Sequence, residues 1–541
     1  MYSLTLYAFC LLLGWAFWKL FGLYFVKSPL DNIPGPKRTS LFKGNTQEIF
    51  NRHGLDYLQK LGEQYGQVVR YHAPLGARGL YVFDPKALSH IVVKDQIYEE
   101  PRWFLRFNLI LFGPGLVSTL GDHHRKQRKL LNPAFSTDHM RHMTPIFYNI
   151  THTLRDTVAA KVQDTPTEVN VLHWLSRGAL EIVGQGGLGF SFDAFSVDKR
   201  NAYAEALQEL PRTIFALHFW RVLLPYVSLI VPASIRRAAA PYLPHAAMQR
   251  LRQIIETMDE QSRRIYETKK ILLEKGDDAV THQMSEGRDI LSILMKANRE
   301  ANEEDRLPED ELIAQMTTIV LAATDTTSNA LGRIFHMLSE HEEIQGKLRA
   351  ELFEAGSDGE DIPYDQLVDL PYLDAVCRET LRLHPPASFI NRETRRDSIL
   401  PLSDPIEGED GSLITEIAVP KDTPLMIAIR SSNRNKALWG DDALEFKPER
   451  WLAPLPDALS NAHVPGIYAN QMTFLGGGRA CIGFKFSQLE MKVVLAVMLR
   501  SFKFLPGGKE VHWNLAPVSY PTAGKDSAKP ELYLKLEPVK V

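Results

Sequence analysis

The segment from Phe474 to Gly483 constrains the fold more than any other part of the sequence. It reads Phe-Leu-Gly-Gly-Gly-Arg-Ala-Cys-Ile-Gly, with the cysteine at position 481, and a helical pattern follows as far as about Leu499. The backbone N–H groups of a glycine-rich turn and the positive end of a following helix both stabilise a thiolate. Such a thiolate can bind a haem iron, although a buried free cysteine beside a glycine turn would give a similar local sequence.

The complete spacing of Phe474, Gly477, Arg479, Cys481 and Gly483 resembles the signature of the cytochrome P450 family, and the resemblance extends over nearly the whole chain. It implies a haem b cofactor with Cys481 as the axial ligand of the iron. It also implies that Arg479 pairs with a haem propionate and that Phe474 shields the sulfur. The two glycines would let the backbone approach the cofactor closely. The implied P450 fold is mainly α with a small β part.

A second motif is Glu379-Thr-Leu-Arg382. Positions i and i+3 share a helix face, so the carboxylate and the guanidinium can meet. An exposed pair of this kind would be a surface salt bridge of little energetic value. The resemblance implies instead a buried pair that is joined by Arg450 from the later segment Phe-Lys-Pro-Glu-Arg-Trp. Glu379, Arg382 and Arg450 are therefore predicted to support the haem-binding loop.

An acid and an alcohol, Asp325 and Thr326, interrupt the apolar helical pattern from Leu312 to Leu338. Polar groups in an apolar helix are unfavourable unless they have partners or a use. The resemblance implies that Thr326 hydrogen-bonds dioxygen and that Asp325 helps to relay protons to it. The alternative is that the Thr326 hydroxyl bonds a carbonyl of the preceding turn. Ala323 departs from the family, which often has glycine at that position.

Three further residues are predicted to contact the haem propionates. His124 and Arg128 are four positions apart and share a helix face. The family frequently has tryptophan where His124 stands. Arg392 matches a third arginine of the family. The alternative for the basic run around Arg128 is a solvated face, or a docking surface for an acidic electron donor, and docking is the role predicted for some of its other members.

The composition excludes two classes of protein. Lys and Arg number 62 against 65 Asp and Glu, so the chain lacks the basic excess of a nucleic-acid-binding protein. Three cysteines, Cys10, Cys377 and Cys481, argue against a disulfide scaffold and favour a reducing compartment.

Residues 1–26 are predicted to form an N-terminal transmembrane helix, with a proline-containing connector at residues 27–44 and the catalytic domain at residues 45–541. The stretch from Leu4 to Val26 is apolar except for Thr5 and Lys19. As a helix it would span about 35 Å, against about 30 Å for the hydrocarbon core. A cleavable signal peptide is the alternative, but no basic residue precedes Lys19. Basic residues after the segment predict a single-pass protein of the endoplasmic reticulum with a cytosolic catalytic domain.

The remaining pattern predicts mostly helices in the middle of the chain and short strands at several places. The apolar segment from Val222 to Val231 is compatible either with a buried helix end or with a surface that dips into the membrane. Strands are expected at Val68 to Tyr71 and Leu80 to Phe83 and among residues 390–429, and helices at Leu291 to Ala297, Leu312 to Leu338, Glu340 to Ala355 and Tyr372 to Leu383.

The resemblance implies a monooxygenase that inserts one oxygen atom from O2 into a lipophilic substrate. Electrons would come from NADPH through a separate cytochrome P450 reductase, with cytochrome b5 as a further partner. The sequence resembles fungal microsomal members, which favours a terpenoid or another secondary metabolite as substrate. The alternatives are a broad-specificity enzyme for foreign compounds, a peroxide-driven enzyme, a rearrangement or dehydration catalyst on the same fold and a haem-thiolate sensor without turnover.

Overall fold

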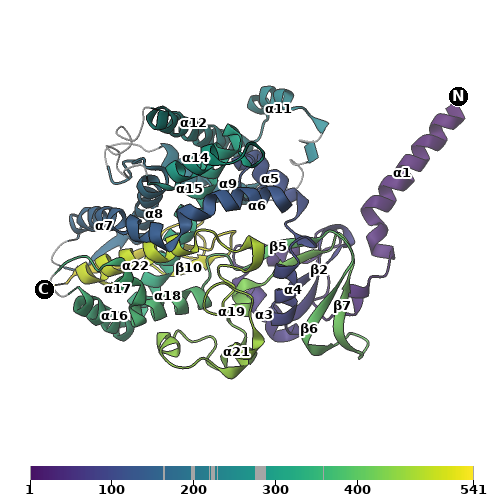
Figure 1. The fold of residues 1–541 in the computed structure, drawn as a ribbon. Helices are drawn as coiled ribbons and strands as arrows, with labels where there is room; N and C mark the ends of the chain where they lie inside the picture. The colour runs from purple at the N-terminus through teal and green to yellow at the C-terminus, as the bar shows by residue number, and fades with distance from the viewer. Residues whose placement is uncertain are drawn as a thin grey trace. The chain divides into compact units, whose positions relative to one another are not determined.

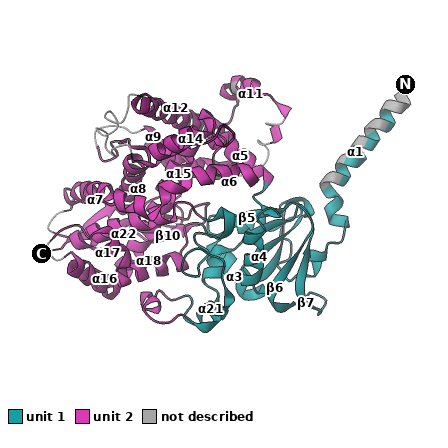
Figure 2. Cartoon of the chain, viewed as in Figure 1, with its two compact units in different colours: residues 1–101, 387–444, 456–480 teal, residues 102–386, 445–455, 481–541 magenta. Residues whose placement is uncertain are grey.

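The computed structural model describes residues 2–162, 165–196, 202–217, 220, 226–227, 230–274, 288–356 and 359–539. Most of the predicted apolar segment from Val222 to Val231 therefore lies outside the described residues. The chain forms two compact units (Figure 2). Unit 1 comprises residues 1–101, 387–444 and 456–480, and unit 2 comprises residues 102–386, 445–455 and 481–541. Each unit draws on separate parts of the sequence, and the predicted anchor and connector belong to unit 1.

Unit 1 is built around a five-stranded sheet with the order β1-β2-β8-β5-β3. Strands β2 and β5 of this sheet are labelled in Figure 1. The predicted strands near residues 68 and 80 are confirmed as β1 and β2, which pair antiparallel. Strand β2 pairs parallel to β8, and β5 pairs antiparallel to both β8 and β3. The strands are β1 (Val68–His72), β2 (Arg78–Val82), β3 (Tyr98–Glu99), β5 (Ile390–Thr394), β8 (Pro424–Ile427) and the separate hairpin β6 (Ser398–Glu407) and β7 (Leu413–Val419).

Short helices complete unit 1. Helix α4 begins after Asp84, whose carboxylate accepts a hydrogen bond from the Ala87 N–H, as expected of an N-cap. The helices are α1 (Tyr2–Phe25), η1 (Pro29–Asn32), α2 (Thr46–Ile49), α3 (Leu55–Tyr65), η2 (Pro74–Gly76), α4 (Pro85–Val93), α19 (Ile429–Asn433), α20 (Lys436–Trp439), α21 (Asp457–Ala462) and η8 (Gly477–Arg479).

Unit 2 is mainly helical, and its central element is the 32-residue helix α15 (Glu309–Glu340). This helix packs against α8 (Val171–Ile182), α12 (Ala246–Glu274), α18 (Pro371–Leu383) and α22 (Phe484–Ser501). The four helices predicted between residues 291 and 383 are confirmed, as is the helix after Gly483. Their boundaries agree closely because long apolar periodicity is the most dependable signal in a sequence.

Two small sheets complete unit 2, with the orders β4-β12-β9 and β10-β11. Their strands are β4 (Thr167–Asn170), β9 (Phe502–Pro506), β10 (Val511–Asn514), β11 (Tyr520–Ala523) and β12 (Tyr533–Pro538). The other helices are α5 (Arg102–Phe112), α6 (Gly121–Leu131), η3 (Asn132–Phe135), α7 (Thr137–Ala159), η4 (Val183–Leu188), α9 (Ala202–Ala216), α11 (Ala233–Ala239), η5 (Ala240–Tyr242), α14 (Ile290–Glu300), η6 (Glu303–Asp305), α16 (Glu342–Ala355), α17 (Tyr364–Asp369) and η7 (Pro448–Leu452).

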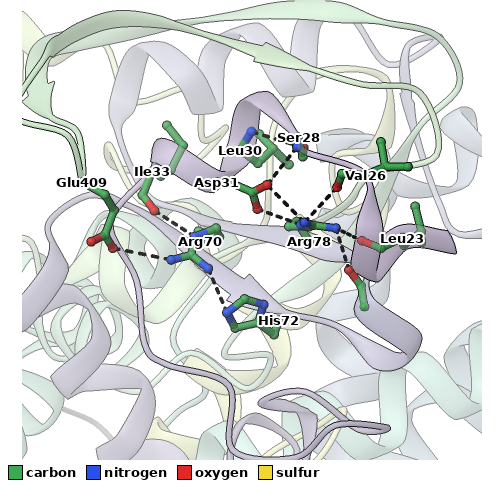
Figure 3. Close-up of polar contacts among 11 residues, drawn as sticks. Leu23, Val26, Ser28, Leu30, Asp31, Ile33, Arg70, His72, Arg78 and Glu409 are labelled. Carbon is green, nitrogen blue, oxygen red and sulfur yellow. Dashed lines mark hydrogen bonds and ion pairs between the residues drawn. The ribbon is translucent and has the colours of Figure 1, made fainter. Parts of the chain in front are cut away.

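Arg78 ties the end of α1 to the sheet of unit 1 (Figure 3). Its guanidinium donates to the carbonyl oxygens of Leu23 and Val26 at the C-terminal end of α1, where carbonyls lack partners within the helix. The same group pairs with Asp31 at 2.8 Å and 3.1 Å. Burial alone would raise the pKa of the Asp31 carboxyl, but Arg78 and a backbone N–H outweigh burial and hold this pKa below its usual value. A cation at a helix C-terminus also interacts favourably with the helix dipole.

Among the residues that the structure describes, no helix has both the length and the apolar character that crossing a membrane requires. The predicted transmembrane anchor is not confirmed.

Candidate active site

Cys481 lies directly before the first turn of α22, as the sequence predicts. Gly483 is the N-cap of this helix, and its N–H donates to the Cys481 sulfur. The side chain of Cys481 keeps accessible surface, although enough protein surrounds the sulfur for burial to raise the pKa of its thiol. The Gly483 N–H and the positive charge of Arg128 act against that rise. A further positive charge at the sulfur, such as that of a bound metal ion, would favour the thiolate.

The glycines before Cys481 allow close approaches between backbone segments of unit 1. Gly477 has φ +66°, and a Cβ at this position would lie 2.2 Å from the carbonyl oxygen of Val92. At Gly476, a Cβ would lie 1.8 Å from the carbonyl oxygen of Pro465. Only glycine fits either position without moving the backbone. Phe474 packs edge-on against Tyr468 with ring centroids 5.6 Å apart, and its shielding of the sulfur stays a prediction.

The structure brings Glu379, Arg382 and Arg450 together in the interior of unit 2. Glu379 and Arg382 on α18 are fully buried, and Arg450 enters from η7. Arg382 donates to both carboxylate oxygens of Glu379 at 2.8 Å and 2.9 Å, and Arg450 Nε donates to Oε1 at 2.9 Å. The surface salt bridge that the sequence left open is therefore excluded. The role of the cluster in supporting the haem-binding loop stays a prediction.

Two members of this cluster escaped the sequence analysis. The indole N–H of Trp451 donates to Glu379 Oε2 at 3.0 Å, and the backbone N–H of Lys447 donates to Oε1 at 3.0 Å. Both residues belong to the Phe-Lys-Pro-Glu-Arg-Trp segment that was identified for its arginine. The signal was therefore present, but a motif cannot tell which of its neighbouring donors point inward.

Asp325 and Thr326 lie in the unbroken helix α15. The Thr326 hydroxyl donates to the carbonyl oxygen of Ala322 at 2.7 Å, which is the back-bonded geometry considered as the alternative. A hydroxyl that donates its proton still has lone pairs to accept a hydrogen bond, so this contact leaves the oxygen-activating role as a prediction. Ala322 is exposed and Thr326 is half-buried.

A neighbour on α15 that the sequence analysis missed, Asn329, holds Asp325 in place. Its amide nitrogen donates to the backbone oxygen of Asp325 at 2.8 Å and to carboxylate Oδ1 at 3.1 Å. Burial raises the pKa of the Asp325 carboxyl to about 7, and the hydrogen bond from Asn329 opposes the rise. A carboxyl with this pKa can hold or release a proton near neutral pH.

The predicted propionate contacts of unit 2 lie on α6. His124 is buried and Arg128 is half-buried, and the charge of Arg128 acts on the Cys481 thiol. The rest of the basic run is more open, as a solvated or docking face requires. Lys129 lies 3.8 Å from Asp305 with most of its side chain exposed, and Arg125 pairs with Asp122.

The predicted propionate contacts of unit 1, Arg392 and Arg479, share one carboxylate. Arg392 on β5 lies 3.5 Å from Glu100 Oε1, and Arg479 on η8 lies 3.3 Å from Glu100 Oε2. The side chains of all three residues are largely buried. Sequence reasoning missed Glu100, because no motif includes it.

The donors of each unit, taken separately, suit a haem cofactor in their chemistry. Cys481 offers an accessible sulfur at the positive end of α22, which suits an iron ligand. Arg392 and Arg479 offer guanidinium donors, which prefer carboxylates such as propionates. The glycine turn at Gly476 and Gly477 excludes side chains where backbone segments approach each other.

Comparisons with known proteins agree with this description. The family model of cytochrome P450 matches residues 34–518. Cytochrome P450 monooxygenase 91 of Postia placenta is 52% identical over 540 residues, which cover 99% of both chains. Cytochrome P450 monooxygenase 219 of the same fungus is 50% identical over 511 residues, covering 94% of this chain and 93% of the relative. Ganoderic acid synthetase of Ganoderma lucidum is 45% identical over 530 residues, covering 97% of each.

Proposed function

Because the chain belongs to the cytochrome P450 monooxygenase family, we propose that it inserts one oxygen atom from O2 into a lipophilic secondary metabolite, of which a terpenoid is the first candidate. Electrons would come from NADPH through a separate reductase. The observation that carries the proposal is the accessible Cys481 sulfur at the start of α22. Arg128 is close enough for its charge to act on the pKa of this thiol. Exposed basic side chains of α6, such as Lys129, support a docking face for an acidic reductase or cytochrome b5.

Different residues of the chain have different roles in the proposed reaction. Haem, when bound, supplies the redox chemistry of oxygen activation, and a thiolate ligand favours O–O cleavage. The Gly483 N–H and the positive end of α22 stabilise the Cys481 thiolate. Asp325 holds a proton at its carboxyl. Asn329 orients that carboxyl through one hydrogen bond to Oδ1, and a second hydrogen bond joins its amide to the backbone oxygen of Asp325. Thr326 contributes a hydroxyl oxygen that can accept a hydrogen bond.

Replacing Thr326 by alanine is expected to keep haem but to uncouple NADPH consumption from product formation. The variant removes the hydroxyl and only one hydrogen bond, to Ala322 O, so the fold should persist. Product formed per NADPH consumed should fall about a hundredfold, which is the lower end of what proton-transfer groups contribute. Thr326→Ser keeps the hydroxyl and serves as the control. Tight coupling in Thr326→Ala would remove this role.

Product yield should also depend on pH through Asp325. Its pKa of about 7 means that the carboxyl carries a proton below that pH and is ionised above it. Product per NADPH is therefore expected to fall as pH rises from about 6.5 to about 8. Asp325→Asn cannot ionise and should give a low yield that changes little over this range. Product per NADPH of the native protein is divided by that of Asp325→Asn, both measured with the same reductase. This ratio cancels the pH dependence of electron supply. A constant ratio would show that Asp325 does not deliver the proton.

The proposed class of substrate is supported by the name of one relative. The name of one protein that is 45% identical over nearly its full length is ganoderic acid synthetase, which supports a biosynthetic role in this chain. We therefore expect a narrow choice of substrate rather than broad oxidation of foreign compounds.

A product screen tests this proposal. Microsomes that contain the chain and a fungal reductase would be given NADPH and a panel of terpenes, fatty acids and aromatic compounds, and extracts would be searched for the gain of one oxygen. A product from one narrow class, absent with Cys481→Ala, would support the proposal. Slow oxidation of unrelated compounds would indicate detoxification instead. No product, despite a normal CO spectrum, would favour a sensor or a peroxide-driven enzyme.

We further propose that α1 anchors the protein to the endoplasmic reticulum membrane, with the catalytic domain in the cytosol. Large apolar side chains of α1 are exposed, which is unfavourable in water and favourable in lipid. They include Leu6, Tyr7, Leu11, Trp15, Trp18 and Phe25.

Deletion of residues 2–26 is expected to move the protein from the membrane pellet to the supernatant. Carbonate washing would distinguish an inserted helix, which resists it, from a helix held at the surface. Arg78→Ala, which frees the end of α1 from unit 1 but keeps its apolar side chains, should stay in the pellet. Retention of the deletion variant in the pellet would contradict anchoring by α1.

A further inference from the structure

Strand pairing in unit 1 fixes the position of Glu100. Strands β3 and β5 pair antiparallel, with Tyr98 opposite Thr394 and Glu99 opposite Glu393. One further step along the same register brings Glu100 opposite Arg392. Residues directly opposite each other on an antiparallel pair project to the same face, close enough for a charged pair to interact. The contact between Glu100 and Arg392 therefore follows from the sheet.

The backbone of Glu100, like its side chain, contacts an arginine. Arg395, just past β5, donates to the carbonyl oxygen of Glu100 and to the Glu99 carboxylate at 2.6 Å, and it also pairs with Glu393 at 3.1 Å. Arg395 thus fastens the end of β3 to the end of β5. Glu100 has little freedom to move away from Arg392.

The carboxylate of Glu100 also reaches a different segment. Its Oε2 lies 3.3 Å from Arg479 in the turn before Cys481, while its Oε1 lies 3.5 Å from Arg392. The exposed fractions of the three side chains are 13%, 14% and 7%, so water screens these charges weakly. Glu100 is thus one anion that links an arginine of the sheet to an arginine of the cysteine-bearing turn.

Without Glu100 the two guanidiniums would repel each other. Burial lowers the pKa of both arginines, and the nearby charge of Arg479 lowers that of Arg392 further, whereas the charge of Glu100 acts against both shifts. Asp95 adds a second negative charge close to the same turn, because its Oδ2 lies 2.7 Å from the place of a Cβ on Gly478. Besides its pairing with Glu100, Arg392 donates to the backbone oxygen of Asn391 at 2.9 Å, and a guanidinium carries five N–H donors in all.

We propose that Glu100 is a positioning residue that holds Arg392 and Arg479 in register to receive the propionates of the haem. Each oxygen of one carboxylate fixes one guanidinium, and the arginines in turn bind the cofactor. The inference rests on the proposed propionate contacts of these arginines. Groups that orient ligand-binding residues in this way typically change affinity by about tenfold to a hundredfold when they are replaced.

The test is the rate at which haem leaves the purified full-length holoprotein for an excess of apomyoglobin. Glu100→Gln removes the charge at nearly constant volume and is expected to release haem about tenfold faster. Glu409→Gln is the matched control, because it neutralises another glutamate of unit 1, whose partner Arg70 is not a predicted propionate contact. Its release rate should stay within about twofold of the native rate. The reduction potential should rise in Glu100→Gln, since removal of a nearby anion favours the more negative reduced haem.

Three further results decide the proposal. Glu100→Asp keeps the charge but is shorter, so its release rate should lie between those of the native protein and Glu100→Gln, and it replaces Glu100→Gln if that variant does not fold. A native release rate in the Glu100 variants, with faster release from Arg479→Lys and Arg392→Lys, would overturn the positioning role alone. Native rates in all of these variants would show that the arginines do not hold the propionates, so the premise itself would fail.

Discussion

Replacing Cys481 by alanine is expected to abolish the thiolate-type spectrum of the reduced CO complex and all product formation. The chain has three cysteines, and Cys481 alone lies in a glycine turn at the start of a helix. Cys377 is buried on α18, and burial raises the pKa of its thiol to about 12, so that it stays protonated. Cys10 lies within α1. Neither can take over as an iron ligand. The absorption spectrum of the reduced, CO-treated microsomes is the measurement.

Cys377→Ala provides the control for this experiment. It removes a buried sulfur of similar size, so any general effect of losing a cysteine would appear in it as well. We expect an unchanged CO spectrum and a modest loss of stability of about 1 kcal/mol, as for the removal of a small buried group. An unchanged spectrum in Cys481→Ala, or loss of the spectrum in Cys377→Ala alone, would overturn the assignment of Cys481.

The elements that the sequence predicted well are those with long periodic patterns. Helix α15 was expected from Leu312 to Leu338 and runs from Glu309 to Glu340. Helix α18 was expected from Tyr372 and begins at Pro371, a residue favoured in the first turn of a helix. Such elements are encoded locally, because periodicity and end signals lie within the segment itself.

The motif residues were predictable for a different reason. Spacing on one helix face predicted the pair of Glu379 and Arg382, and the resemblance to the P450 family implied that Arg450 joins them across 71 residues of chain. Spacing does not report what else enters the same space. Trp451 donates to Glu379 and Asn329 donates to Asp325 because of the direction in which their side chains point. A single sequence does not reveal that direction.

Glu100 illustrates a harder limit. Its partners Arg392 and Arg479 are about 300 and 380 residues away, and the contact depends on the register of β3 with β5. Strand β3 has only two residues, too few for any periodic signal. Register between strands distant in sequence is set by tertiary packing, so such a residue becomes visible only in the structure.

Replacing Glu379 by alanine is the second change with a large expected effect, namely loss of haem retention and of stable folded protein. The carboxylate receives five hydrogen bonds, two from Arg382 and one each from Arg450, Trp451 and the Lys447 backbone. Removing it leaves the charge of Arg382 fully buried without its anion and that of Arg450 nearly so. Breaking a buried ion pair from one side destabilises a protein by about 3–5 kcal/mol. Haem content per purified protein and thermal unfolding are the measurements.

Glu449→Gln is the matched control because it changes the same residue type within the neighbouring η7 segment. Glu449 is more than a third exposed and pairs with Lys347 and the Tyr372 hydroxyl near the surface. Exposed pairs contribute at most about 1 kcal/mol, so this variant should keep its haem. If both variants kept native haem content, the cluster would be dispensable for cofactor retention. A third outcome is that Glu379→Ala loses haem and still unfolds at the same temperature as the native protein. The cluster would then act on the cysteine loop directly rather than through global stability.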